Sequence, residues 1–153
     1  MAHFNWLKNV RIGTAIAIIT TGLGLGLSVN AQTPSSQISQ GVYLYGQSAQ
    51  PEQLGSEYLV FQVQNDRVVG ASYYPQSEYA CFTGRILGDQ LQLQVQDPYE
   101  PDIFSSYALD ISFEDSFVAG TAVPELSLIG YRALETITAN DRRLLDSCLD
   151  SLP

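Results

Sequence analysis

The chain has 153 residues, a length that predicts one domain, and 16 acidic against seven basic residues give it a formal net charge of −9 at pH 7. Such an excess of negative charge repels nucleic acid and anionic membrane, so nucleic-acid binding is excluded. The composition holds one His, one Lys and two Cys, which leaves few residues for nucleophilic or metal chemistry.

The N-terminal segment predicts an export signal. Lys8 and Arg11 provide positive charge ahead of a long apolar stretch, and Val29 and Ala31 occupy the −3 and −1 positions that signal peptidase prefers. The predicted signal peptide therefore covers residues 1–31. The alternative is an uncleaved anchor, because the apolar stretch, residues 12–29, reaches the lower limit of about 18 residues for spanning a bilayer.

Cleavage would remove the His and the Lys together with the signal. The mature chain would keep five basic residues, all arginine, and a net charge of −11 (5 − 16). Ser-His-Asp and Cys-His arrangements, His-ligated metal sites and lysine Schiff bases are then impossible. We expect no cofactor, and no membrane contact once the signal is removed.

Short strands dominate the predicted domain, residues 41–153, which follows a disordered lead-in over residues 32–40. Apolar and polar residues alternate with a period of two, most clearly where Leu91, Leu93 and Val95 alternate with glutamines. The predicted strands, in chain order, are residues 42–45, 58–64, 67–74, 79–86, 90–96, 107–113, 117–122 and 126–133.

The turns between these strands are short, which predicts an antiparallel meander. Asn65-Asp66 and Gly88-Asp89 are good two-residue hairpin signals, and Glu114-Asp115 is a weaker one. About eight sequential strands favour a mainly β fold, a small closed barrel without an open edge, around packed side chains or one small ligand. A two-sheet sandwich is the alternative.

The C-terminus changes to a helical period over residues 138–152. One helical face carries Leu144, Leu145, Cys148, Leu149 and Leu152, so the helix is expected to pack outside the barrel. Thr138 and Asp141 have the spacing of a capping box, with Asp in place of Glu.

Cys81 and Cys148 predict a structural disulfide. If Phe82 and Ile86 line the interior, alternation turns Cys81 outward, beneath a helix whose packing face carries Cys148. Export makes a disulfide chemically expected, because such bonds persist outside the reducing cytosol. A reactive thiol is the alternative, and it would need a cationic neighbour that lowers its pKa.

Two groups of side chains are candidate sites. Asp97, Glu100 and Asp102 in "DPYEPD" offer oxygen ligands for a hard cation, or an acid/base pair for glycoside hydrolysis, although an acidic turn in solvent has the same composition. Tyrosine and arginine side chains at the barrel mouth suit a small anionic or aromatic ligand, although tyrosine is also an ordinary strand residue. This second group comprises Tyr73, Tyr79, Arg85, Tyr131 and Arg132.

Three segments, "YYPQSEYACFTGRI", "DPYEPD" and "ITANDRRLLDSC", together resemble a family of small exported cyanobacterial proteins to which no activity is assigned. The resemblance covers most of the mature chain and carries no catalytic motif. It implies a location in the cyanobacterial envelope or lumen.

We therefore expect an exported, non-enzymatic protein that binds a small molecule or a protein partner in the periplasm, the thylakoid lumen or the extracellular space. A carboxylate-dependent hydrolase and a structural accessory subunit of a larger assembly are the alternatives. The sequence does not specify the oligomeric state.

Overall fold

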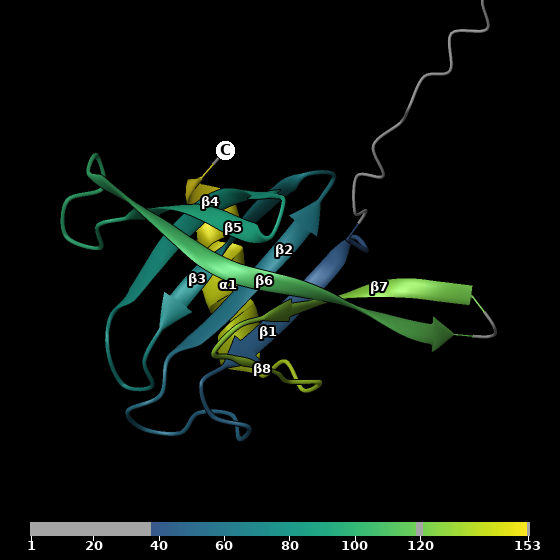
Figure 1. Cartoon of the computed structure of the whole chain (residues 1–153). Coiled ribbons are helices and arrows are strands. Elements are labelled where there is room, and N and C mark those ends of the chain that lie inside the picture. Colours follow the sequence, from purple (N-terminus) through teal and green to yellow (C-terminus); the bar gives the residue numbers. More distant parts are fainter. Residues whose placement is uncertain (1–37, 119–120, 153) are drawn as a thin grey trace, which may run out of the picture. The chain divides into compact units, whose positions relative to one another are not determined.

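The computed structural model describes residues 38–118 and 121–152, which all belong to one compact unit, Pro34–Pro153. The predicted signal peptide and most of the predicted lead-in lie outside the described residues. Within them are eight strands and one helix (Figure 1), namely β1 (Gly41–Gly46), β2 (Tyr58–Gln64), β3 (Arg67–Tyr73), β4 (Tyr79–Leu87), β5 (Gln90–Gln96), β6 (Phe104–Val118), β7 (Thr121–Leu128), β8 (Arg132–Ala133) and α1 (Ala139–Ser151).

The strands form an antiparallel meander in the order β7-β6-β5-β4-β3-β2-β1-β8. The short β8 follows β7 after a turn at Gly130, whose φ is +89°, and pairs with β1 at the other end of the order. The sheet thereby curls into a nearly closed barrel. The predicted mainly β meander with an outer C-terminal helix is confirmed. Within the described residues, no helix is long and apolar enough to cross a membrane.

Two predicted hairpins are confirmed in their register. Gln64 pairs with Arg67 across Asn65-Asp66, and Asn65 has a φ of +49°. Leu87 pairs with Gln90 across Gly88-Asp89, and Gly88 has a φ of +63°. Asn and Gly reach this left-handed region at low cost, which is why these dipeptides predict tight turns.

The predicted turn at Glu114-Asp115 is wrong. Glu114 pairs with Glu125 inside a long strand, and β6 runs on until Val118 pairs with Thr121. Glu114-Asp115 contains neither Gly nor Asn, the residues that reach positive φ at the lowest cost, whereas the two residues between Val118 and Thr121 in the sequence are Ala-Gly. The predicted strands 107–113, 117–122 and 126–133 are therefore replaced by β6, β7 and β8.

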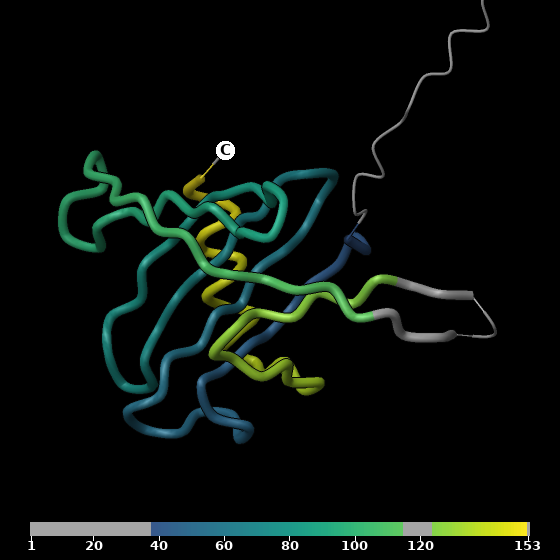
Figure 2. Tube along the Cα trace, viewed as in Figure 1, coloured from purple at the N-terminus to yellow at the C-terminus, as the bar shows by residue number. Residues whose placement is uncertain are grey.

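The predicted small barrel is confirmed as a nearly closed one, and the described strands leave one edge along β6. β6 pairs with β5 through Phe104–Asp110 and with β7 through Ile111–Val118, so it changes partner midway (Figure 2). Along the first of these two segments β6 has β5 on one side and no strand of the described residues on the other. The reason is the length of β6, which continues past the end of β5 before β7 begins to pair.

Side chains fill the barrel interior. The inward faces of the strands contribute a core that includes Phe61 and Phe82, both 0% exposed. These two residues lie on either side of Gly70 in register, and their rings are 6.3 Å apart. A Cβ atom on Gly70 would lie only 2.3 Å from the Val60 carbonyl oxygen, so the glycine lets the strands approach closely.

A second core lies outside the barrel, where α1 packs on the outer face of β2, β3 and β4. Thr138 caps the helix through the predicted capping box with Asp141. The predicted apolar helix face is confirmed, because Leu144, Leu145 and Cys148 are buried in this core.

Candidate functional site

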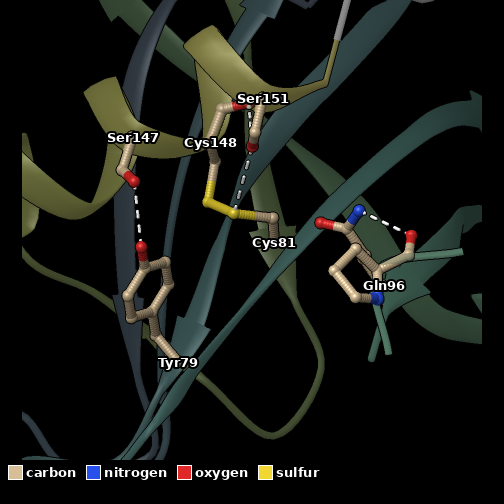
Figure 3. Close-up of a disulfide and its surroundings, with 7 residues drawn as sticks. Tyr79, Cys81, Gln96, Ser147, Cys148 and Ser151 are labelled. Atoms are coloured by element: carbon tan, nitrogen blue, oxygen red, sulfur yellow. Dashed lines mark hydrogen bonds between the residues drawn. A yellow bond between two sulfur atoms is a disulfide. The ribbon is translucent and has the colours of Figure 1, made fainter. Parts of the chain in front are cut away.

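The disulfide joins α1 to the barrel. Cys81 on the outer face of β4 is bonded to Cys148, with the two Cα atoms 5.3 Å apart, and both residues are buried (Figure 3). The Ser151 hydroxyl lies 3.8 Å from the Cys81 sulfur. The predicted pairing is confirmed, so neither cysteine is a free thiol. A disulfide of this kind is expected in an oxidising compartment outside the cytosol.

Three tyrosines form a row beneath and beside the helix. Tyr58, Tyr73 and Tyr79, here called the tyrosine row, occupy adjacent register positions on β2, β3 and β4. The rings of Tyr58 and Tyr73 stack with centroids 5.5 Å apart. Gly46 precedes them on β1, where a Cβ would lie 2.6 Å from the Tyr58 ring. The absence of a side chain at Gly46 therefore leaves room for the Tyr58 ring at the β1 end of the row.

Each hydroxyl of the tyrosine row meets a segment outside the sheet. The Tyr58 hydroxyl donates to the carbonyl oxygen of Gln50 in the β1–β2 loop at 2.5 Å. The Tyr73 hydroxyl donates to Asp141 of α1. The Tyr79 hydroxyl lies 2.9 Å from the Ser147 hydroxyl (Figure 3). The row therefore positions both the loop and the helix.

Asp141 is the buried acid of this interface, and it is 0% exposed. Its carboxylate accepts from the Thr138 N–H at 2.8 Å as well as from the Tyr73 hydroxyl. Burial, followed by this hydrogen bond and the carboxylate charge, raises the pKa of Tyr73. From the sequence, Asp141 is predicted only as part of the capping box. Its spacing from Leu144, Leu145 and Cys148 places it on the packing face of the helix, a signal that could have revealed the burial.

Tyr73 and Tyr79, two of the predicted ligand-binding residues, line a surface pocket of about 220 Å³. The β3–β4 turn, residues 74–77, forms one wall, and Asn140, Arg143 and Leu144 of α1 form the other. Arg143 is not among the predicted ligand-binding residues, because its proximity to the β3–β4 turn depends on how the helix docks. An aromatic pocket with one guanidinium has the chemistry for a small anionic molecule.

The other three predicted ligand-binding residues do not line this pocket. Arg85 is exposed and lies six residues along β4 from Tyr79, a separation of about 20 Å. Tyr131 donates a hydrogen bond to Glu57 at 2.7 Å, and its pKa is raised by burial and then by this carboxylate. Arg132 is paired in register with Gly46.

One carboxylate of the acidic loop between β5 and β6 has a structural role. Asp97 accepts hydrogen bonds from the backbone N–H groups of Tyr99 and Glu100 at 2.8 and 3.0 Å, which stabilises the loop. Glu100 and Asp102 are exposed. In the described part of the chain no group of three or more His, Cys, Asp or Glu could hold a metal ion. A cation site or hydrolytic pair here stays a prediction.

The first five residues of the strand after this loop are exposed on both faces. From Phe104 to Ala108, here called the open edge, every residue is exposed, although the neighbouring strand buries Leu91 and Leu93. Phe104 is 44% exposed and Tyr107 57%. Exposed apolar side chains on a strand at the edge of a sheet are typical of an interaction site.

No strand in the described part of the chain pairs with the outer side of the open edge. Asp97 N–H bonds the Ile103 carbonyl and Ile111 N–H bonds the Asp89 carbonyl, which fixes the odd-numbered residues of this segment as those bonded to β5. The N–H and C=O groups of the even-numbered residues therefore point away from β5, at Phe104, Ser106 and Ala108. The open edge is not apparent from the sequence, in which Glu114-Asp115 predicts a turn within β6.

Comparisons with protein-family models, with curated proteins and with solved structures find no match to this chain. Its class follows from the fold alone, a small barrel-like β protein with a disulfide.

Proposed function

We propose that the protein is an exported, non-enzymatic accessory protein that binds a protein partner through the open edge. The observation that carries the proposal is a strand segment with exposed side chains on both faces and, within residues 38–118 and 121–152, no strand paired along one side. Side chains occupy the barrel interior, which favours recognition at the surface. Addition of a strand to such an edge supplies main-chain hydrogen bonds to a partner.

Two further features support the location that we propose. The disulfide suits an oxidising compartment, and the predicted signal peptide suits export to one. With the resemblance in three segments of the sequence, we infer a place in the cyanobacterial envelope or lumen.

A proline substitution in the open edge tests the function. In Ser106→Pro the substituted N–H is one that points away from β5, so the β5–β6 pairing is kept while an added strand loses a donor. Ser106→Ala is the matched control, because both variants lose the hydrogen bond at 2.8 Å from the Gln94 amide. We expect partners cross-linked in the source organism to be recovered with wild type and Ser106→Ala and lost with Ser106→Pro. Equal recovery with all three would contradict the function.

The pocket beneath Tyr73 and Tyr79 supports a second candidate, the binding of a small anion. Native mass spectrometry of protein isolated from its source tests it. We expect a bound mass in wild type that is lost in Arg143→Gln and kept in Arg142→Gln, a neighbouring exposed arginine outside the pocket lining. A bare protein mass in wild type under gentle conditions would contradict it.

A further inference from the structure

We propose that the occupant of the open edge is an extended segment of a partner protein in which apolar and basic residues alternate. This inference rests on the proposed function and specifies the chemistry of the partner. Three properties of the site support it, namely the length of free backbone, the two exposed faces and the surrounding charge.

The free backbone has a defined length. At one end the Asp110 carbonyl already accepts from the Ile129 N–H at 2.9 Å, so pairing with β7 begins there. At the other end, Pro101 precedes the strand and lacks an N–H. Between them, Phe104–Ala108 presents alternate N–H and C=O groups over about 17 Å. A partner segment of about five residues fits this length.

The face of the open edge that continues the barrel interior favours apolar residues of the partner. Tyr107 lies on this face in register with Leu93, and Leu109 follows in register with Leu91. Leu109 packs against the interior core, yet Tyr107 is 57% exposed. Apolar side chains at alternate positions of an added strand would cover the Tyr107 ring and extend the core.

Carboxylates lie at both ends of the open edge, and they favour basic residues in the partner segment that binds between them. Glu100 and Asp102 precede it and Asp110 follows it, all three exposed. The ring of Tyr99, which is 77% exposed, offers a surface for a cation. Arg85 lies on β4, two strands away from the open edge, because it pairs in register with Gln92 of β5, which in turn pairs with Ala108. Lysine or arginine on the outer face of an added strand would therefore meet mainly negative charge.

The same charges argue against a second copy of this chain. Antiparallel pairing of two open edges centred on Ser106 would place Asp102 of each copy opposite Asp110 of the other. Opposed like charges destabilise strand pairing. Each chain also carries a formal net charge of −9, which disfavours association in general.

Peptide binding tests the inference. The probes are two seven-residue peptides, one alternating valine with lysine and one alternating valine with glutamate, titrated into the protein by NMR. We expect the lysine peptide to bind at least about tenfold more tightly and to shift the amide signals of Phe104–Ala108. Ser106→Pro should abolish this binding, and Ser106→Ala should preserve it. The double variant Glu100→Gln with Asp102→Asn should weaken it several-fold and reduce its dependence on salt.

The outcomes separate the inference from the proposed function. Equal binding of both peptides, or tighter binding of the glutamate peptide, overturns the basic partner and leaves strand addition intact. Binding of neither peptide overturns the inference, and the function then stands only if partner recovery still depends on Ser106→Pro. A dimer in sedimentation equilibrium that Ser106→Pro dissociates would show that a second copy occupies the edge, which also overturns the inference.

Discussion

The outer face of β2–β4 and the open edge of β6 are both aromatic strand surfaces, and they differ in what covers them. Under α1, Tyr73 is 4% exposed, stacks on Tyr58 and donates to Asp141. On the open edge, Tyr107 is 57% exposed. The disulfide-linked helix α1 thus covers the first aromatic surface. No element within the described residues covers the second.

This difference indicates separate roles for the two regions. Interactions that cover the helix face contribute to the free energy of unfolding, because they bury apolar surface and satisfy polar groups. Side chains of the open edge contribute little to the free energy of unfolding, because they are exposed. They can therefore contact a binding partner without loss of stability. The following predictions test this division, beginning with the largest expected effect.

Loss of the disulfide should weaken the helix face most. The bond closes a sequence separation of 67 residues, which corresponds to about 4 kcal/mol in the chain-entropy model. We expect Cys81→Ser with Cys148→Ser to lose most of this amount in urea unfolding. Added reductant should destabilise wild type and leave the double variant unchanged. A double variant as stable as wild type would show that the helix stays docked without the bond.

A methyl group at Gly46 should disturb the same face. Its Cβ would lie 2.6 Å from the Tyr58 ring and 2.8 Å from the Ser48 carbonyl oxygen, so Gly46→Ala should cost about 1–3 kcal/mol. Gly41→Ala on the same strand is the control, because its Cβ would meet only Tyr43 at 3.9 Å. Equal unfolding midpoints for the two variants would mean that the Tyr58 ring is free to move.

The buried hydroxyl of Tyr73 should matter more than the outer one of Tyr79. Tyr73→Phe removes one of the two hydrogen bonds that the buried Asp141 carboxylate accepts, the other being from the Thr138 N–H, and should cost about 1–3 kcal/mol. Tyr79→Phe removes an exposed hydrogen bond to Ser147 and should cost less than about 1 kcal/mol. Thermal unfolding of both variants gives the comparison, and the reverse order would refute the role of Asp141.

Alkaline pH should destabilise the protein through its buried tyrosines. Burial raises the pKa of Tyr45 and Tyr73 above the ordinary value of 10.0, so above pH 10 the folded state keeps protons that the unfolded state releases. The contribution of these tyrosines to the free energy of unfolding is complete below pH 10. Above pH 10 the free energy of unfolding falls by about 1.4 kcal/mol per pH unit for each such group. We expect Tyr73→Phe to have a shallower slope between pH 10 and 11. An equal slope would mean that Tyr73 ionises in the folded state.

Substitution on the open edge should have the smallest effect on stability. Tyr107→Ser should change the free energy of unfolding by less than about 0.5 kcal/mol, as expected for an exposed side chain. It should nevertheless weaken binding of the alternating valine–lysine peptide, measured by the same titration. A large loss of stability in this variant would show that the edge belongs to the folding core.

Local sequence patterns were sufficient for much of the fold. Alternation located the bounds of β2 and β5, turn residues such as Asn65 and Gly88 located two hairpins, and helical spacing located α1 with its capping box. The pairing of Cys81 with Cys148 followed from the face that each residue occupies. Each of these features depends on residues close together in the chain or on a single periodicity.

What the sequence did not predict depends on register between distant segments. The open edge exists because β6 passes from β5 to β7 at Ile111, a position that the alternation of apolar residues does not mark. Arg85 and Tyr79 share a strand, yet they lie at opposite ends of it, whereas Arg143 reaches the pocket from the helix. Such proximity is fixed by docking and by strand offset, which a periodic pattern leaves undetermined.

Hydrogen exchange along β6 tests the existence of the open edge most directly. In the free protein, we expect the amides of Phe104, Ser106 and Ala108 to exchange rapidly, while those of Ser105 and Tyr107, which bond to β5, are protected. The alternation should disappear when the valine–lysine peptide binds, because an added strand pairs with the even-numbered amides. Strong protection of Ser106 and Ala108 in the free monomer would show that the edge is already covered and would contradict the proposed binding site.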